Sequence, residues 1–388
     1  MADKRDKRKK NNLAEQSDYD SYKNSIPEDQ IWDFKIEGLQ PPHVNKPYHN
    51  VRLKKITVVV VLIASISLSI FFSVRAVHND TYKYNDLGDG TFEFVKFSNP
   101  GDMKNVTVDF VDGDKTKPIS VLHEYVFNCD EMITEVNLGK SIREIDGKSF
   151  YSCYALKAIH VDEENEYFCD VDGVLFSKDK SVLICYPIDH DRYLREKYGY
   201  EKQLWPEDSE YDEEYETKIN TYVIPETVKT VGMLAFNYSE LFNVYLPEGL
   251  EKLETMCFFR NWHLANISSY TGDLAGEIEN GKAFGSGVSV KPSLPDSLKY
   301  IGSDAFNSAI CVDYMFIPEN VEFIGHHAFW GAARNEGGKL IGIFEIHAAL
   351  SEEEFKAKVE TGDQWTGEYD SGLFQKKVPV IYGETRAQ

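Results

Sequence analysis

Two groups of side chains in this sequence have residue types that could bind a metal ion. Seven acidic residues lie between Glu207 and Glu216, and carboxylates are the ligands that calcium prefers. The run lacks the spaced ligands and the turn glycine of a calcium loop, so we interpret it as a solvated acidic segment. His326 and His327 are adjacent, and adjacent side chains point apart, whereas an i, i+4 pair can chelate one ion. The sequence therefore predicts no metal site.

Residues that could carry catalysis form no recognisable constellation. The sequence has no nucleophile elbow, no phosphate-cradling glycine loop and no zinc-protease helix. Its six cysteines are widely and irregularly spaced, without the two-residue separation of a zinc or redox motif. We interpret them as mostly buried thiols, while their even number leaves disulfides open. We therefore expect a protein that is not an enzyme and needs no cofactor.

The charge of the chain is unevenly distributed. Residues 1–55 contain 12 Lys and Arg against 9 Asp and Glu, whereas residues 56–388 contain 30 against 55. A surface this acidic repels nucleic acid and anionic lipid headgroups. We therefore expect no nucleic-acid partner for the larger part.

One apolar segment predicts a membrane helix. Ile56–Val74 comprises 19 residues without a charge, about 28 Å of helix, which is close to the thickness of the hydrocarbon core. Lysines and arginines cluster before this segment, so the N-terminus is expected in the cytoplasm and the larger part outside the cell. The 55 residues before it favour an uncleaved anchor over a signal peptide, although cleavage near residues 74–76 stays an alternative. A buried core helix is disfavoured, because no amphipathic face is present.

The N-terminal 55 residues predict a disordered, basic cytoplasmic tail, because they lack sustained apolar periodicity. Ile31–Leu39 is the only apolar patch within it. This patch could bind a cytoplasmic partner or rest on the membrane surface.

A repeat of 22 or 23 residues is visible in the C-terminal part, and it can be aligned on six phenylalanines. Aliphatic residues stand eight and five positions before each phenylalanine, and proline stands eleven before four of them. The aligned phenylalanines are Phe127, Phe150, Phe236, Phe258, Phe306 and Phe329.

Each repeat is interpreted as one coil of a solenoid. A short strand, such as Val136–Leu138, Val244–Leu246 or Met315–Ile317, is ended by a proline or its equivalent, and aliphatic residues and the phenylalanine then fill the interior. A single coil cannot bury its apolar edge, so several must stack between capped ends. Glycines after the second aliphatic position (Gly232, Gly302, Gly325) are expected to allow a tight turn.

These motifs resemble the BspA-type leucine-rich repeat, a family of bacterial cell-surface proteins. The stretches IPETVKTVGMLAF, LPDSLKYIGSDAF and IPENVEFIGHHAF carry the resemblance, and Asn165–Pro187 looks like the hairpin insertion of such arrays. Glu254 and Asp146 depart from the pattern at glycine positions, Gly139 departs at a proline position, and Cys257 replaces alanine. The resemblance implies a β-rich solenoid of short strands, turns and short helical segments, preceded here by one transmembrane helix.

The expected organisation follows from these patterns. Insertions near 190–220 and 268–291 break the register and are expected to be loops on one face. Gly88–Phe97 looks like a cap hairpin, and the segment containing Trp365 looks like the C-terminal cap. The predicted parts are the tail (1–55), the transmembrane helix (56–74), the N-terminal cap (75–117), the solenoid (118–345) and the C-terminal cap (346–388).

A binding face is predicted by the alternation of side chains along each strand. The residue beside each core position should point to the exposed concave side. These residues are Asn137, His160, Val223, Tyr245, Ser293 and Phe316. The resemblance implies ligand binding or adhesion at the plasma membrane, with a protein or glycan as partner, and no oligomeric state is predicted. The alternative is a structural or signalling element that couples the solenoid to a cytoplasmic partner through the tail.

Overall fold

The computed structural model describes ten stretches of the chain, all within the second of its two compact units, Ala64–Gln388. The described residues are 82–99, 103–127, 130–205, 208–279, 288–309, 314–331, 333–336, 339–342, 345–366 and 378–386. The predicted tail and membrane helix lie outside them. Within these stretches, no helix has the length and apolar character needed to span a bilayer.

An antiparallel hairpin begins the described chain. Its strands are β1 (Tyr82–Asp86) and β2 (Phe92–Phe97), and β2 pairs in parallel with β4 (Ile119–Leu122), which pairs with β6 (Glu144–Ile145). A hairpin is present as predicted, but it begins before the expected bounds: Gly88–Phe97 contains the turn and β2, and β1 lies before it.

The repeating strands begin before the expected end of the N-terminal cap. The strand β3 (Asn105–Val108) pairs in parallel with β5 (Glu135–Leu138), and β5 pairs with β7 (Ala158–Val161). A short 3-10 turn, η1 (Val111–Gly113), follows β3. The first coil of the solenoid is therefore already present near residue 105.

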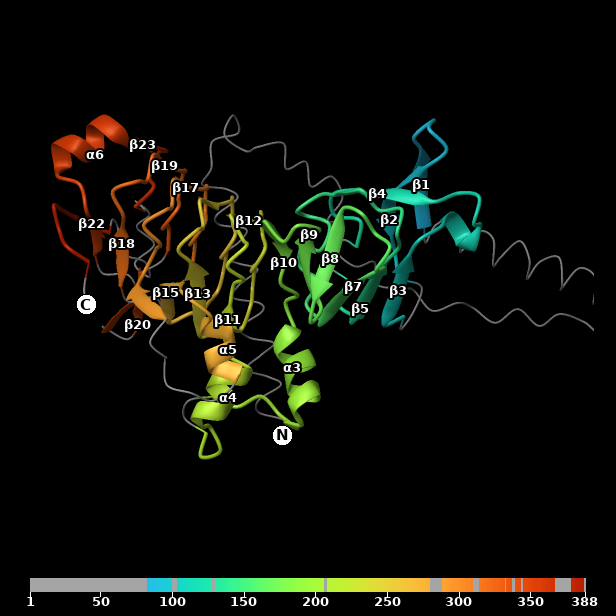
Figure 1. Ribbon diagram of the computed structural model, residues 1–388, viewed down its shortest axis with the longest axis horizontal. Helices are drawn as coiled ribbons and strands as arrows, with labels where there is room; N and C mark the ends of the chain where they lie inside the picture. Colours follow the sequence, from blue (N-terminus) through green and yellow to red (C-terminus); the bar gives the residue numbers. More distant parts are fainter. Residues whose placement is uncertain are drawn as a thin grey trace, which may run out of the picture. The chain divides into compact units, whose positions relative to one another are not determined.

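A second set of strands continues the stack along the chain. Figure 1 shows β10, β12, β17 and β19 following one another in the middle and C-terminal coils. The hairpin predicted at Asn165–Pro187 is confirmed, because β8, β9 and β10 pair antiparallel before β10 joins β12 in parallel. In pairing order the sheet contains β23 (Glu360–Thr361), β19 (Phe323–Ile324), β17 (Tyr300–Ile301), β14 (Lys252–Leu253), β12 (Thr230–Val231), β10 (Val182–Cys185), β9 (Val174–Ser177) and β8 (Phe168–Val171).

The longer strands of the same coils form another face. One sheet contains β11 (Thr221–Val223), β13 (Asn243–Pro247), β15 (Asn266–Thr271) and β16 (Ser289–Pro292), with β16 antiparallel to β15. The next sheet contains β18 (Met315–Ile317), β22 (Ile346–Ala348) and β24 (Val380–Tyr382), all parallel. A separate hairpin pairs β20 (Ala333–Glu336) with β21 (Lys339–Gly342).

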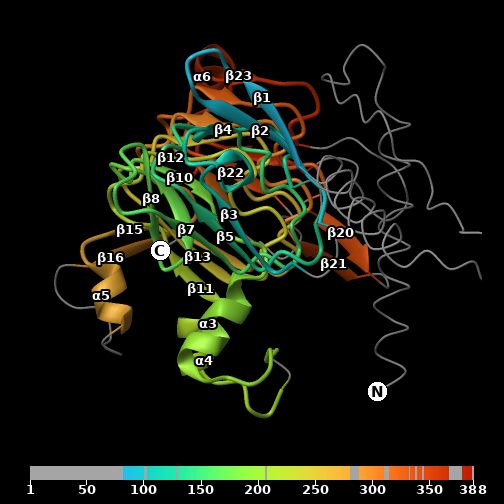
Figure 2. The same ribbon diagram turned by 90° about the vertical axis from the view of Figure 1, so that its right-hand side faces the viewer.

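The two insertions predicted as loops contain helices. The first contains α3 (His190–Tyr198) and α4 (Glu213–Lys218), and the second contains α5 (Leu274–Glu279). Figures 1 and 2 show all three helices protruding on the side of the coils where β11 lies. The C-terminal coils carry α6 (Glu352–Lys358), which begins with a capping box between Ser351 and Glu354.

The end of the acidic run is helical for a physical reason. The Asp212 carboxylate accepts a hydrogen bond from the Tyr215 backbone N–H at 2.7 Å and caps α4, and three glutamates occupy the first turn, where the helix dipole favours negative charge. The Tyr215 ring is fully buried with Leu194, Leu204 and Ile219 in a small core of the insertion's own. The insertion therefore packs against itself.

The six phenylalanines of the repeat are buried as predicted, and they stack in two sets: Phe127 on Phe150 in one core cluster, and Phe236, Phe258, Phe306 and Phe329 in series in another. Neighbouring rings lie nearly parallel, with centroids 5.0 Å apart for Phe236–Phe258 and 5.4 Å apart for both Phe258–Phe306 and Phe306–Phe329. Tyr186 of the hairpin takes the same place in its coil and stacks on Phe236 at 5.2 Å. Truncating one buried ring of this kind costs about 3–5 kcal/mol.

A backbone ladder runs beside the phenylalanines. The N–H of Phe258 donates to Ala305, and the N–H of Phe306 donates to Ala328 in the following coil. Residues two positions before and two after the phenylalanine adopt a left-handed conformation, as at Met256 (φ 57°) and Arg260 (φ 57°). These turns point backbone N–H groups toward the next coil, so the ladder continues where no regular strand exists.

The repeat glycines allow adjacent coils to pack closely. The prediction that they allow a tight turn was wrong. Gly232, Gly302 and Gly325 do not have a positive φ. A Cβ on Gly325 would lie well under 3.0 Å from the Ser303 backbone nitrogen, and a Cβ on Gly302 would meet the backbone of Thr255. Adjacent coils approach so closely here that only glycine fits.

Gly325→Ala should lower the free energy of unfolding by about 1–3 kcal/mol, because the new methyl group collides with backbone that cannot move aside. Gly249→Ala is the matched control, since its Cβ would meet only the flexible end of Lys229. Urea unfolding of both variants measures the difference. Equal stability of the two would contradict the close-approach explanation.

Candidate functional site

Two of the predicted binding residues lie side by side on the N-terminal strands. Asn137 of β5 is in register with His160 of β7, and both side chains are half-buried, whereas Val136 and Leu138 are buried in the core. The His160 Nδ1 atom lies 3.7 Å from the Asp170 carboxylate of β8. The expected alternation is therefore present on β5.

Two more predicted residues pair on the middle strands. Val223 of β11 is in register with Tyr245 of β13, and Tyr245 is in register with Ser268 of β15. These three residues therefore form a row across neighbouring strands. Burial and then the Glu216 carboxylate of α4 raise the pKa of the Tyr245 hydroxyl. The insertion helix thus contributes to the environment of this face, which periodicity alone did not indicate.

The other two predicted residues are buried, which corrects the expectation that they are exposed. Ser293 has no exposed surface, and Phe316 is 4% exposed. The Phe316 backbone N–H donates to the Ser293 hydroxyl at 2.8 Å, so this hydroxyl bridges β16 and β18 where regular strand pairing stops. The Arg386 guanidinium lies 4.9 Å from the centre of the Phe316 ring. Phe316 is therefore covered by a residue 70 positions later, which no strand pattern could indicate.

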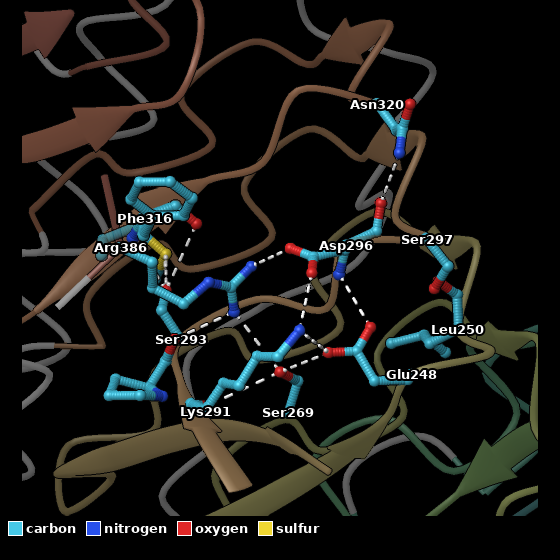
Figure 3. A network of polar contacts seen from close by, with 12 residues as sticks. Glu248, Leu250, Ser269, Lys291, Ser293, Asp296, Ser297, Phe316, Asn320 and Arg386 are labelled. Carbon is cyan, nitrogen blue, oxygen red and sulfur yellow. Dashed lines mark hydrogen bonds and ion pairs between the residues drawn. The ribbon is translucent and has the colours of Figure 1, made fainter. Parts of the chain in front are cut away.

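Arg386 is the centre of a polar network that fastens the C-terminal segment to the sheet (Figure 3). Its guanidinium donates to Asp296 at 2.5 Å and to the Pro292 carbonyl at 3.1 Å. Lys291 lies 2.8 Å from the same aspartate and 3.7 Å from Glu248. Only 11% of the Arg386 side chain is exposed, so these charge-assisted bonds are partly shielded from water.

A hollow of about 660 Å³ lies at the ends of the strands β3 and β7. It is lined by charges of both signs, and Lys140 pairs with Glu164 at 2.7 Å. Burial, and then the Asp162 charge, raise the pKa of the Asp109 carboxyl. The Asp109 side chain occupies the space that a Cβ on Gly139 would need, which explains why the repeat has glycine here in place of proline.

The adjacent histidines connect coils. His326 Nδ1 accepts a hydrogen bond from the Asp363 backbone N–H at 3.0 Å, and the His327 ring contacts the Gln364 amide oxygen at 3.0 Å. Within the described stretches, no three His, Cys, Asp or Glu side chains are grouped to hold a metal ion. We therefore interpret these two histidines as residues that connect the last coils of the solenoid.

The cysteines within the described stretches are free thiols. Cys153, Cys185 and Cys257 are buried as expected, and Cys169 is partly exposed. Burial raises the pKa of the Cys185 thiol to about 12, so this side chain stays protonated and unreactive at neutral pH. Cys129 and Cys311 lie outside the described residues.

Asp304 is a buried carboxyl beside the phenylalanine stack. It accepts a hydrogen bond from the Asn307 amide at 2.6 Å. Burial raises its pKa to about 6, against the opposing effects of that bond and of His327 and His326. Ionisation of this carboxyl is thus harder in the folded protein than in the unfolded chain.

Arg386→Ala should lower the free energy of unfolding by about 1–3 kcal/mol, because it removes charge-assisted bonds and uncovers the Phe316 ring. Amide exchange in β16 and β18 should become faster. Lys299→Ala is the control, because its ion pair with Glu251 is about half exposed and is worth less than about 1 kcal/mol. Unchanged unfolding and exchange in the Arg386 variant would exclude a fastening role.

Asp304→Asn should change how stability depends on pH. The pKa of Asp304 is raised in the folded state, so this group contributes stability at pH values below 3.8, its pKa in the unfolded chain. This contribution is lost as the pH rises through about 6. The variant should be more stable than the natural chain by about 1–3 kcal/mol at pH 8 and equally stable near pH 4. Thermal unfolding across this range measures the effect.

Asp89→Asn should change the pH dependence of stability in the opposite direction, because Thr91 and Arg143 hold the pKa of Asp89 below its ordinary range.

Comparison with solved structures finds leucine-rich-repeat proteins at low identity. One from Eubacterium ventriosum is 14% identical, with a TM-score of 0.36, over 73% of this chain and 82% of that one. The pneumococcal vaccine antigen PcpA is 17% identical, with a TM-score of 0.33, over 78% and 83%. A leucine-rich cell-surface protein from Faecalibacterium prausnitzii is 17% identical, with a TM-score of 0.33, over 77% and 74%. At these values the likenesses carry no argument about function.

Comparison with curated proteins finds no match. The family model of the BspA-type leucine-rich repeat region matches residues 97–172 and 213–335 in six copies, which is more than half of the chain. The gap between the matches contains β9, β10 and α3. The chain belongs to the BspA-type leucine-rich-repeat family.

Proposed function

We propose that this chain is anchored in the plasma membrane by residues 56–74 and binds a protein or glycan outside the cell through a non-catalytic surface of the solenoid. Stacked repeats create extended surfaces whose side chains are held by a rigid backbone ladder. The family match indicates no enzymatic family. The proposed location is supported by the uncharged 19-residue segment and the basic residues before it.

The observation that carries the proposal is the in-register row of half-buried side chains on neighbouring strands. Asn137 and His160 lie on one sheet, and Val223 and Tyr245 on the next. Such residues can contact a ligand without unfolding the coil, because other residues form the hydrophobic core. Half-buried aromatic residues also lose little side-chain entropy on binding.

The location can be tested on intact cells. Protease added outside should remove the C-terminal part and leave a short N-terminal fragment associated with the membrane. Protection of the C-terminal part on intact cells, with digestion only after lysis, would overturn the proposed topology.

The alternative is a structural or signalling element that acts through residues 1–50. Deletion of these residues should leave external binding intact under the first proposal. Loss of the cellular function with binding retained would favour the alternative.

Tyr245→Ala should weaken binding of residues 80–388 to a ligand found on a protein and glycan array by about tenfold, because a contacting aromatic ring contributes about 1–2 kcal/mol. Tyr167→Ala is the control, because this side chain is 50% exposed and lies on another part of the surface. Melting curves establish that both variants are folded. Full binding by the Tyr245 variant would remove this face from the proposal.

A further inference from the structure

An exposed tyrosine continues a cluster of aromatic rings on the turns that follow the stacked phenylalanines. The exposed large hydrophobic side chains within the described stretches are Leu87, Met132, Tyr154, Tyr167 and Tyr198. Of these, Tyr154 packs its ring against another aromatic ring, Tyr238, with centroids 5.3 Å apart and planes at 82°. Tyr198 differs, because the ammonium groups of Lys197 and Lys218 lie over its ring.

The cluster extends across coils that are far apart in sequence. The Tyr238 ring contacts Trp262 at 6.0 Å and Phe259 at 6.1 Å, in both cases nearly perpendicular. The Arg260 guanidinium donates to the Tyr238 hydroxyl at 2.8 Å and lies 5.2 Å from the centre of the Phe259 ring. We call Tyr154, Tyr238, Arg260 and Trp262 the turn-side aromatic surface; Phe259 is buried, at 7% exposed.

The backbone at the turn positions of Tyr238 and Arg260 does not require large residues. Tyr238 and Arg260 stand two positions after the phenylalanine with φ of 57°, a conformation that disfavours bulky side chains. The same place is taken by Ser152, Ser308 and Gly331 in other coils, which stack equally well. The fold therefore accepts small residues here, and large flat side chains occur in neighbouring coils at a conformational cost.

We propose that the turn-side aromatic surface binds a neutral polysaccharide, whose sugar rings stack on Tyr154 and Trp262. This inference rests on the proposed function; it names a ligand class and adds a second surface to the strand face. Tyrosine and tryptophan present a rigid apolar face beside a polar group, which suits a sugar ring with apolar C–H bonds on its faces and hydroxyls at its edge. The rings of Tyr154 and Trp262 each pack edge-to-face with Tyr238, at centroid distances of 5.3 and 6.0 Å.

The charge of the chain disfavours polyanionic partners. Residues 56–388 contain 55 acidic against 30 basic residues, so nucleic acids, anionic lipids and acidic polymers are repelled at long range. A neutral polysaccharide experiences no such repulsion. Its affinity depends on stacking and hydrogen bonds, which the aromatic rings and the Arg260 and Tyr238 donors supply.

The test uses the full-length chain in mild detergent, with insoluble cellulose, chitin and xylan as probes. The natural chain should sediment with at least one of them, and Tyr154→Ala and Trp262→Ala should each weaken binding by about tenfold or more. Tyr154→Phe should retain binding, because the ring and not the hydroxyl stacks on the sugar. Tyr167→Ala should also retain it, and melting curves identify any misfolded variant.

The outcomes separate this inference from the proposed function. Polysaccharide binding that survives both alanine variants, or is lost only with Tyr245→Ala, would exclude this surface while the proposed function stands. Failure to bind all three polymers, together with a protein hit on the array, would replace the glycan by a protein ligand. Failure of both assays would overturn the inference and the proposed function together.

Discussion

The stacking of one aromatic ring per coil is the interaction on which the rest of the described structure depends. In a single coil, the phenylalanine and two aliphatic side chains are exposed at the edges of the coil. These side chains are buried only when a neighbouring coil or cap packs on each side. Rings 5.0–5.4 Å apart also fix the rotation of successive coils, because a shifted coil would open a gap in a densely packed interior. The ends of the stack must then be covered. The β1–β2 hairpin packs Tyr84 and Phe94 near Phe127 at one end, and Trp365 meets Phe329 at the other.

The same close stacking decides what the chain can place between coils. At Gly302 and Gly325 the neighbouring backbone leaves no room for a side chain, whereas at Gly139 the vacant space is filled by the Asp109 carboxylate. Additional residues can only leave the stack. The first insertion does so and packs Tyr215 into a core of its own, and its carboxylates become the cap and first turn of α4. Acidic residues that look like a solvated run in sequence thereby stabilise a helix.

The surfaces available for recognition follow from this architecture. Strand residues beside the core, such as Asn137 and Tyr245, keep one side toward solvent where the sheet is regular. Near β16 and β18 the sheet is interrupted, and Arg386 covers the place where Phe316 would otherwise be exposed. The turns after the phenylalanines carry no such cover at Tyr154, which is 43% exposed. The packed core thus holds two surfaces with different chemistry, the strand face and the turn-side aromatic surface. A ligand at either surface would contact side chains that are already in place.

The amino-acid sequence by itself determined the repeat, its buried phenylalanines and the hairpins near Gly88–Phe97 and at Asn165–Pro187. These features depend on residue type at fixed spacing, because each coil has nearly the same environment as the next. The tertiary structure alone decided the partners that lie far apart in sequence: Arg386 over Phe316, Asp109 above Gly139, Tyr154 against Tyr238, and Tyr186 in the place of a phenylalanine. Local periodicity cannot encode these contacts, because they depend on how the irregular segments return to the stack. Asn137 and Tyr245 follow the predicted alternation, because each is half-buried between buried neighbours. His160 and Val223 are half-buried on strands whose burial does not alternate, and Ser293 and Phe316, at the interruption of the sheet, are buried.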